Sequence, residues 1–288
     1  MFKKFSSVVL FLSFLATGLL AQNSVIWEVT GNNLTSASYL MGTLKFIGEK
    51  EYYLPANVPG LLQECSVFAI EDRVDHHAQH ELNKALHFPK GQSLETLSPD
   101  VYAKTQSFFS TEFGIEKSVF NAKYARLKPL AISMTMIRLS LGEKVRFYDI
   151  ELLKLAKKNK LKTYSLETIE REAQALNAYP IQDQLIALTH SLDNFATLKE
   201  EFRKLMADYP KGELEEIFQY TLHPIEQNPQ FVEEFYTKRN QEWMVKIKKM
   251  MASNPSFIAV GVSHLEGEKG LLELLKKEGY TLTPLPVE

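Results

Sequence analysis

The sequence has a single cysteine, Cys65, among its 288 residues. One cysteine excludes any intrachain disulfide, so a core must hold the fold together, and a chain of this length can bury one. Positive charge is not in excess either, because 33 Lys and Arg stand against 35 Asp and Glu. The formal net charge of −2 at pH 7 predicts no general attraction to nucleic acid or to anionic lipid.

Several motifs that identify enzyme classes are absent. The chain has no P-loop, no Rossmann glycine fingerprint and no C-x-x-C pair, and it has no internal repeat or low-complexity segment. The segment GVSHL resembles the G-x-S-x-G motif of α/β-hydrolases, but Leu265 replaces the last glycine. Neither an Asp nor a His follows His264, so the Ser-Asp-His order of that fold is excluded.

A long apolar run occurs at the N-terminus. Lys3 and Lys4 precede an apolar stretch from Val8 to Leu20, which is the order of a secretory signal peptide. The stretch is short for a membrane span, which needs about 20 residues. We therefore expect a signal peptide at 1–22, an exported protein that is periplasmic or secreted, and no stable membrane span after its removal. A retained N-terminal anchor is the alternative.

Strand-like segments occur towards both ends of the chain, and helical patterns fill the middle. The segments typical of strands are residues 24–33, 37–48, 66–72, 161–167 and 257–261. Helices that alternate with strands favour crossover connections. We predict an α/β (mixed α+β) fold whose central β-sheet, built from N- and C-terminal segments, is flanked by helices.

The domain organisation follows from the same pattern. Residues 23–288 are expected to form a single domain, with a helical insertion or lid at roughly 180–253, where no convincing strand occurs. A separate helical domain is the alternative. Three helix starts are predicted from capping signals: Pro99 after Ser98, Pro129, and a helix capped by Asp149.

Polar residues follow three of the predicted strands. Lys45 comes shortly after Gly42 and Thr43, Glu71 follows the strand in SVFAIED, and His264 follows FIAVG. Ligands of open α/β sheets collect at the carboxyl ends of strands, and Glu and His bind divalent metals or exchange protons. The pattern alone leaves the ordinary alternatives open, namely a structural histidine and a solvated acid.

The chain resembles the TraB/GumN family, the TraB–PrgY–GumN group that also includes the Tiki ectodomains, from about Val25 to Leu285. The similar segments occur in the family's order: YLMGTLKFIG, SVFAIED, FYDIELLKLAKKNKLKTYSLETIEREAQ, YTKRNQEWMVKI and FIAVGVSHLEGEKGLLELLKKEGY. The resemblance implies a fold similar to that of erythromycin esterases and ChaN-like proteins. It also implies a metal-dependent hydrolase site, since Tiki members act as metalloproteases.

That family site consists of two Gly-x-x-His motifs and an intervening glutamate. By position, the second motif is Gly261 to His264 and the glutamate is Glu71, which would ligate a metal with His264 or act as a general base. Arg239 would steady an anionic intermediate. The resemblance further marks Glu167 and Gln174 as family positions, and we expect Gly42, Thr43, Lys45, Glu167, Gly261 and Ser263 to contact a ligand.

The first motif departs from the family, because Lys45 stands where a histidine is expected. An ammonium has no lone pair for a metal. Either a weakened site for Zn²⁺, Mn²⁺ or Co²⁺ remains, or the site is free of metal. In the second case the Lys45 ammonium would lie within about 4 Å of Glu71, and His264 would be a hydrogen-bonding partner.

Two functions follow from these alternatives. One is a metal-dependent, peptidase-like hydrolase with an altered first motif. The other is a non-catalytic relative that keeps the pocket and binds a peptide or small-molecule ligand. Lys45 is the residue that separates them.

Overall fold

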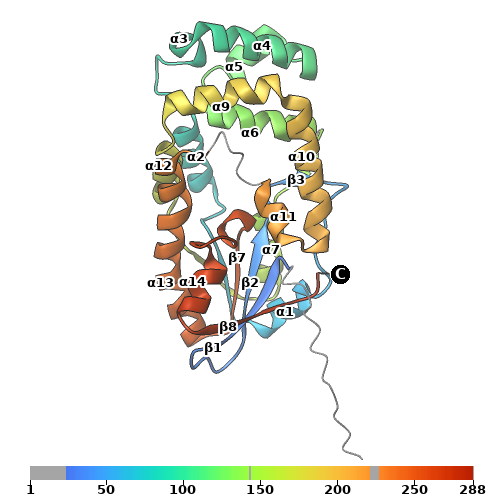
Figure 1. Cartoon of the computed structure of the whole chain (residues 1–288), viewed down its shortest axis with the longest axis vertical. Coiled ribbons are helices and arrows are strands. Elements are labelled where there is room, and N and C mark those ends of the chain that lie inside the picture. Colours follow the sequence, from blue (N-terminus) through green and yellow to red (C-terminus); the bar gives the residue numbers. More distant parts are fainter. Residues whose placement is uncertain (1–23, 143, 221–226, 288) are drawn as a thin grey trace, which may run out of the picture.

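The computed structural model describes residues 24–142, 144–220 and 227–287. The predicted signal peptide at 1–22 lies outside these residues. A sheet with packed helices forms the lower part of the molecule in Figure 1, and a layer of helices lies above it.

Six strands form the central sheet in the order β6-β4-β7-β2-β1-β8. They are β1 (Ile26–Gly31), β2 (Ser38–Thr43), β4 (Val67–Ile70), β6 (Lys162–Ser165), β7 (Ser256–Gly261) and β8 (Tyr280–Pro284). Strands β6, β4, β7 and β2 are parallel, and β1 is antiparallel to both β2 and β8. The predicted mixed α/β fold is confirmed, with N- and C-terminal strands side by side at the centre of the sheet.

The first two strands form a hairpin. Ile26 lies opposite Met41, and the chain reverses through Gly31, Asn32 and Asn33, which all have positive φ. Glycine and asparagine tolerate this left-handed conformation better than other residues. The expected continuous strand at 37–48 is interrupted, however. Strand β2 ends at Thr43, and the chain resumes in the short β3 (Ile47–Gly48), which pairs with β5 (Val145–Arg146) in a separate two-stranded sheet.

The central strands are buried because helices pack against the sheet. All of β2 and β4, and β7 up to Val260, lie inside, which explains why FIAV reads as an unbroken apolar run. Their side chains share one core with helices α1 (Val58–Glu64), α7 (Tyr148–Lys158), α13 (Lys238–Ser253) and α14 (Leu271–Lys277).

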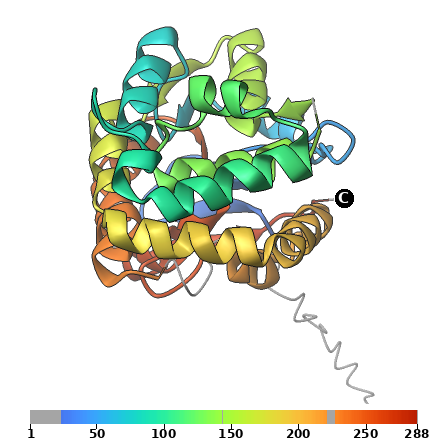
Figure 2. The ribbon, with the colours of Figure 1, turned by 90° about the horizontal axis from the view of Figure 1, so that it is seen from above.

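A second layer of helices has a core of its own, which includes Phe109, Phe120, Ile132 and Leu188. Figure 2 shows these helices from above, lying over the sheet. The remaining helices are α2 (His76–Leu86), α3 (Leu94–Leu97), α4 (Pro99–Phe113), α5 (Lys117–Lys123), α6 (Pro129–Ser140), α8 (Ile169–Asn177), α9 (Ile181–Asp193), α10 (Phe195–Asp208), α11 (Leu214–Gln219), α12 (Pro229–Val232) and the turns η1 (Tyr209–Lys211) and η3 (Glu233–Thr237). Of these, α10, η1 and α11 also contribute side chains to the sheet core. The layer therefore draws on residues 94–140 as well as on the predicted helical segment.

The helix starts were predicted with mixed success. Pro99 and Pro129 are the first residues of α4 and α6, as expected. The prediction that Asp149 caps α7 is wrong, because Phe147 is the N-cap and Asp149 lies inside the first turn. Its carboxylate interacts electrostatically with Lys45.

Candidate functional site

Four parallel strands end at the same edge of the sheet, and a polar residue follows each. Lys45 follows β2, Glu71 follows β4, Glu167 follows β6, and His264 ends the short turn η4 (Val262–His264) after β7. These strand ends converge, because Lys45, Glu71 and His264 line one cavity together with Ser263. Parallel pairing brings them together although almost 220 residues separate the first from the last.

Gly42 and Thr43 fix the position of β2 at this edge. Gly42 lies opposite Val260 and Thr43 opposite Gly261 in the β2–β7 pair. The Thr43 hydroxyl donates to the Val260 carbonyl at 3.1 Å, and the Tyr209 hydroxyl donates to the Gly42 carbonyl at 2.7 Å. Thr43 also lines the cavity. Gly42 therefore has a structural role, and Thr43 connects the sheet to the cavity floor.

Glu71 and Glu167 lie side by side because the β4–β6 pairing continues past both strand ends. The Glu167 amide donates to the Glu71 carbonyl at 2.9 Å. The Glu167 side chain is almost completely buried, whereas that of Glu71 is partly exposed to the cavity. Two buried carboxylates this close require a compensating positive charge.

Arg239 supplies that charge, and its side chain is 0% exposed. Its Nε lies 3.0 and 3.1 Å from the two carboxylate oxygens of Glu167, and its Nη2 lies 2.5 Å from Glu167 Oε1 and 2.9 Å from Glu71 Oε2. Nη1 faces the Phe235 carbonyl and His264 Nε2, both at 3.2 Å. All three guanidinium nitrogens therefore have partners.

The aromatic surroundings of Arg239 fix its plane. The guanidinium carbon lies 4.5 Å from the ring centre of Phe235 and 4.7 Å from that of Trp243. Phe235 belongs to η3, a π-helical turn directly before α13. Such turns are rare and often occur at functional sites. Two rings this close to a buried guanidinium add cation–π attraction to its ion pairs.

Asn240 sets the tautomer of His264. The Asn240 amide nitrogen donates to the carbonyls of His264 and Lys269, at 3.3 and 2.8 Å. Its amide oxygen must therefore accept from His264 Nδ1, which lies 2.7 Å away. The bare Nε2 lone pair of His264 is left to accept from Arg239. Burial, together with the charges of Arg239 and Lys45, lowers the pKa of His264 to about 3, so the ring is neutral at pH 7.

Glu71 is ionised and uses both of its oxygens. Oε1 accepts from the Gly261 amide at 2.5 Å, and Oε2 accepts from Arg239. Burial alone would raise its pKa, but Arg239, Lys45 and the protonated form of His264 lower it to about 2. A Cβ atom on Gly261 would lie 3.0 Å from Glu71 Oε1, so this close approach favours glycine.

The predicted Lys45–Glu71 ion pair is wrong. Lys45 Nζ lies 3.7 Å from Glu172, a residue of α8, while Arg239 takes the place beside Glu71. The charge of Glu172 raises the pKa of Lys45 above its ordinary value. The Lys45 side chain is 51% exposed and borders the cavity.

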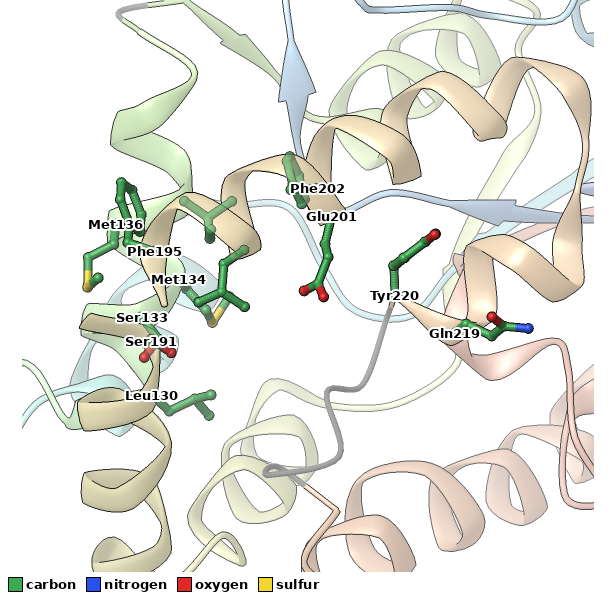
Figure 3. Close-up of a pocket in the computed structure, with 12 residues that line it drawn as sticks. Leu130, Ser133, Met134, Met136, Ser191, Phe195, Glu201, Phe202, Gln219 and Tyr220 are labelled. Carbon is green, nitrogen blue, oxygen red and sulfur yellow. The ribbon is translucent and has the colours of Figure 1, made fainter. Parts of the chain in front are cut away.

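The cavity has a polar floor and apolar walls. Its volume is about 370 Å³, and it lies between the edge of the sheet and side chains of α2, α6, α8, α10 and η3. A second chamber of about 410 Å³ adjoins it, and the two share Leu130, Met134, Ile137, Phe202 and Tyr220. Figure 3 shows the second chamber, between α6 and the residues of α10 and α11.

Sequence reasoning missed three residues of this site. Glu172 and Asp149 are two of 35 acidic residues, and no sequence pattern distinguishes them from the others. Only the fold shows that both interact with Lys45. Asn240 directly follows Arg239, and a polar pair on one helix turn was the available signal. Gln174, which the resemblance marked, lies on the exposed side of α8 and does not line the cavity.

The donor set does not fit the divalent metal that the resemblance implies. Both oxygens of Glu71 have partners, His264 Nε2 faces a guanidinium, and the Lys45 ammonium has no lone pair. A cation at His264 Nε2 would be repelled by Arg239. Across the part of the chain that the structure describes, no three His, Cys, Asp or Glu side chains are arranged to hold a metal ion.

Among the described residues, none of the helices combines the length and the apolar character that a bilayer crossing requires.

Comparisons with known proteins agree with the resemblance. The chain is 24% identical to the metalloprotease TIKI2 and 22% to TIKI1 of Danio rerio, and 21% to TIKI1 of Homo sapiens. Each match covers 92% of this chain but only 61–63% of the relative, so the chain spans about three fifths of these proteins. No solved structure matches. The sequence profile of the TraB/PrgY/gumN family matches residues 25–284, and the chain therefore belongs to that family.

Proposed function

We propose that this protein is a non-catalytic member of its family that binds a small-molecule or peptide ligand in the cavity without a metal ion. The observation that carries the proposal is the place of Arg239. Its guanidinium pairs with both buried carboxylates and faces the lone pair of His264, which is where a catalytic cation would have to lie.

The cavity itself supports a binding role. Its volume of about 370 Å³ lies in the range of roughly 300–1,000 Å³ that small-molecule sites occupy. Apolar walls and a few convergent polar groups are also typical of such sites. Thr43, Lys45 and Ser263 offer polar side chains to a ligand.

A metal-dependent peptidase is the second candidate function. The Tiki relatives favour it, since they are metalloproteases and match 92% of the chain. Glu71 and His264, both at the cavity, are the ligand types such an enzyme needs. This candidate requires Arg239 to leave His264 Nε2 and requires another group to replace the missing histidine at position 45.

Calorimetric titration with Zn²⁺, Mn²⁺ and Co²⁺ separates the two. We expect no stoichiometric metal binding by the wild type, and a gain in affinity for Lys45→His, because imidazole restores a donor. Stoichiometric binding by the wild type that His264→Ala abolishes would establish the second candidate. His77→Ala is the matched control, since His77 is exposed in α2 and does not line the cavity.

Export is part of the proposal. The charged-then-apolar order of residues 1–22 supports a cleaved signal, with the mature protein beginning near residue 22 or 23. N-terminal sequencing after expression in a bacterial host tests this. Full-length protein in the soluble cytoplasmic fraction would contradict export.

A further inference from the structure

The second chamber carries a charged group that the site described above does not use. Glu201, on α10, lines this chamber and is half-buried. In Figure 3 its carboxylate points into the space between Met134 and Tyr220. Among the ion pairs and hydrogen bonds of the described residues, Glu201 has none, although its neighbour Glu200 pairs with Arg203. A half-buried carboxylate without a partner is available to a ligand.

Aromatic residues line the same chamber. Phe202 and Tyr220 line the chamber with Glu201, and both also line the first cavity. Aromatic faces attract organic cations, and a nearby carboxylate strengthens that attraction. A carboxylate beside aromatic rings is therefore suited to an organic ammonium group.

The charge of the connected chambers points the same way. Of the charged residues that line them within the described part of the chain, Lys45 is the cation, and Glu71, Glu172 and Glu201 are the acids. Behind the floor, the single positive charge of Arg239 is shared between Glu167 and Glu71. Lys45 already pairs with Glu172, so an anionic ligand would meet surplus negative charge, whereas a cation would be attracted.

The walls between the two chambers are apolar. Leu130, Met134 and Ile137 of α6 line both of them. A ligand whose charged group lies at Glu201 would place its remaining atoms against these side chains and reach towards the floor of the first cavity. Burial of that apolar surface would supply most of the binding free energy.

We propose that the connected chambers bind an organic monocation with an apolar body, whose ammonium group lies at Glu201 between Phe202 and Tyr220. This rests on the proposed function, that the cavity is a ligand site. The chemistry is shared by a lipophilic amine and by the free N-terminus of an apolar peptide.

The test uses three probes that share one chain and differ in head group: octylamine, octanol and octanoate, titrated calorimetrically at pH 7. We expect one octylamine per chain, bound at least tenfold more tightly than octanol, with octanoate weakest. Glu201→Gln should abolish the preference for octylamine and leave octanol binding unchanged. The control is Glu200→Gln, at the preceding position, which lines neither chamber. It should change neither the preference for octylamine nor the affinity for octanol.

Two further probes identify the source of the ammonium group. Tight binding of the amide of Leu-Leu-Leu, lost on N-acetylation, would identify a peptide N-terminus. Binding of octylamine alone would identify a small amine. Equal affinity for octylamine and octanol, or no effect of Glu201→Gln, would overturn the inference but keep the ligand site. Failure of every probe to bind would overturn the inference and the ligand site together.

Discussion

At the scale of single residues, Arg239 holds the site together. Charged side chains are almost never fully buried unless they are paired. Arg239 is acceptable inside the protein because Glu71, Glu167, Phe235 and His264 use its donors. The two carboxylates depend on it in turn. Removing one member of such a cluster destabilises the protein strongly, since the remaining buried charges then have no compensating charge.

Replacement of Arg239 should be strongly destabilising. Arg239→Met keeps the apolar length of the side chain but leaves Glu71 and Glu167 buried beside each other without a counter-charge. We expect a loss of about 3–5 kcal/mol in the free energy of unfolding, measured by urea denaturation at pH 7. The exposed Arg203 serves as control. Arg203→Met should change the free energy of unfolding by less than about 0.5 kcal/mol. A similar small loss for both variants would contradict the account.

The neutral state of His264 has a pH signature. Its pKa is about 3 in the folded protein against an ordinary value of 6.5, so between these values the unfolded chain binds more protons. The stability contributed by His264 is therefore complete above about pH 6.5 and decreases as the pH falls towards 3. His264→Gln lowers the free energy of unfolding relative to wild type. We expect this loss to become smaller as the pH falls from 6.5 to 4.5, by up to about 1.4 kcal/mol per pH unit.

Urea denaturation of wild type and His264→Gln across that range measures the effect. Other titrating groups, including Asp149 with its pKa raised by burial to about 6, are present in both proteins and cancel in the difference. His77→Gln should show no such trend, because that side chain is exposed. A pH-independent cost for His264→Gln would mean that the ring is not held neutral.

At the scale of elements, parallel strand ends made much of the site predictable. An apolar run that ends in a polar residue placed Glu71 and His264 at strand ends, and parallel pairing brought them to one edge. The partners were less predictable. Glu172 and Arg239 lie on helices, and no sequence periodicity shows which turn of a helix will face a sheet edge. The Lys45–Glu71 prediction failed for this reason.

The packing of β2 against η4 should be intolerant of any side chain at Gly42. A Cβ there would lie 2.7 Å from Leu265 Cδ1 and 3.1 Å from Val262 Cα, a backbone atom. Gly42→Ala should therefore lower the free energy of unfolding by about 1–3 kcal/mol. Gly60→Ala is the matched control in α1, because nothing lies within 4 Å of its Cβ and alanine favours a helix by up to about 1 kcal/mol. Equal thermal stability of both variants would contradict this packing.

At the scale of the whole molecule, two cores enclose the cavity. The sheet core supplies the polar floor, and the helical layer, with a core around Phe109 and Ile132, supplies much of the apolar wall. Strand and helix patterns were sufficient to predict the fold class. They could not show that residues 94–140 join the later helices over the sheet, because that arrangement depends on contacts between distant segments. The division into a domain with a helical insertion remains a prediction.

The central claim is that the cation of this site is Arg239 and not a metal ion. Native mass spectrometry of protein purified without chelators tests it most directly. We expect the mass of the polypeptide alone for the wild type. One Zn²⁺, Mn²⁺ or Co²⁺ per chain in the wild type, lost in His264→Ala and retained in His77→Ala, would contradict the claim and favour the metal-dependent peptidase.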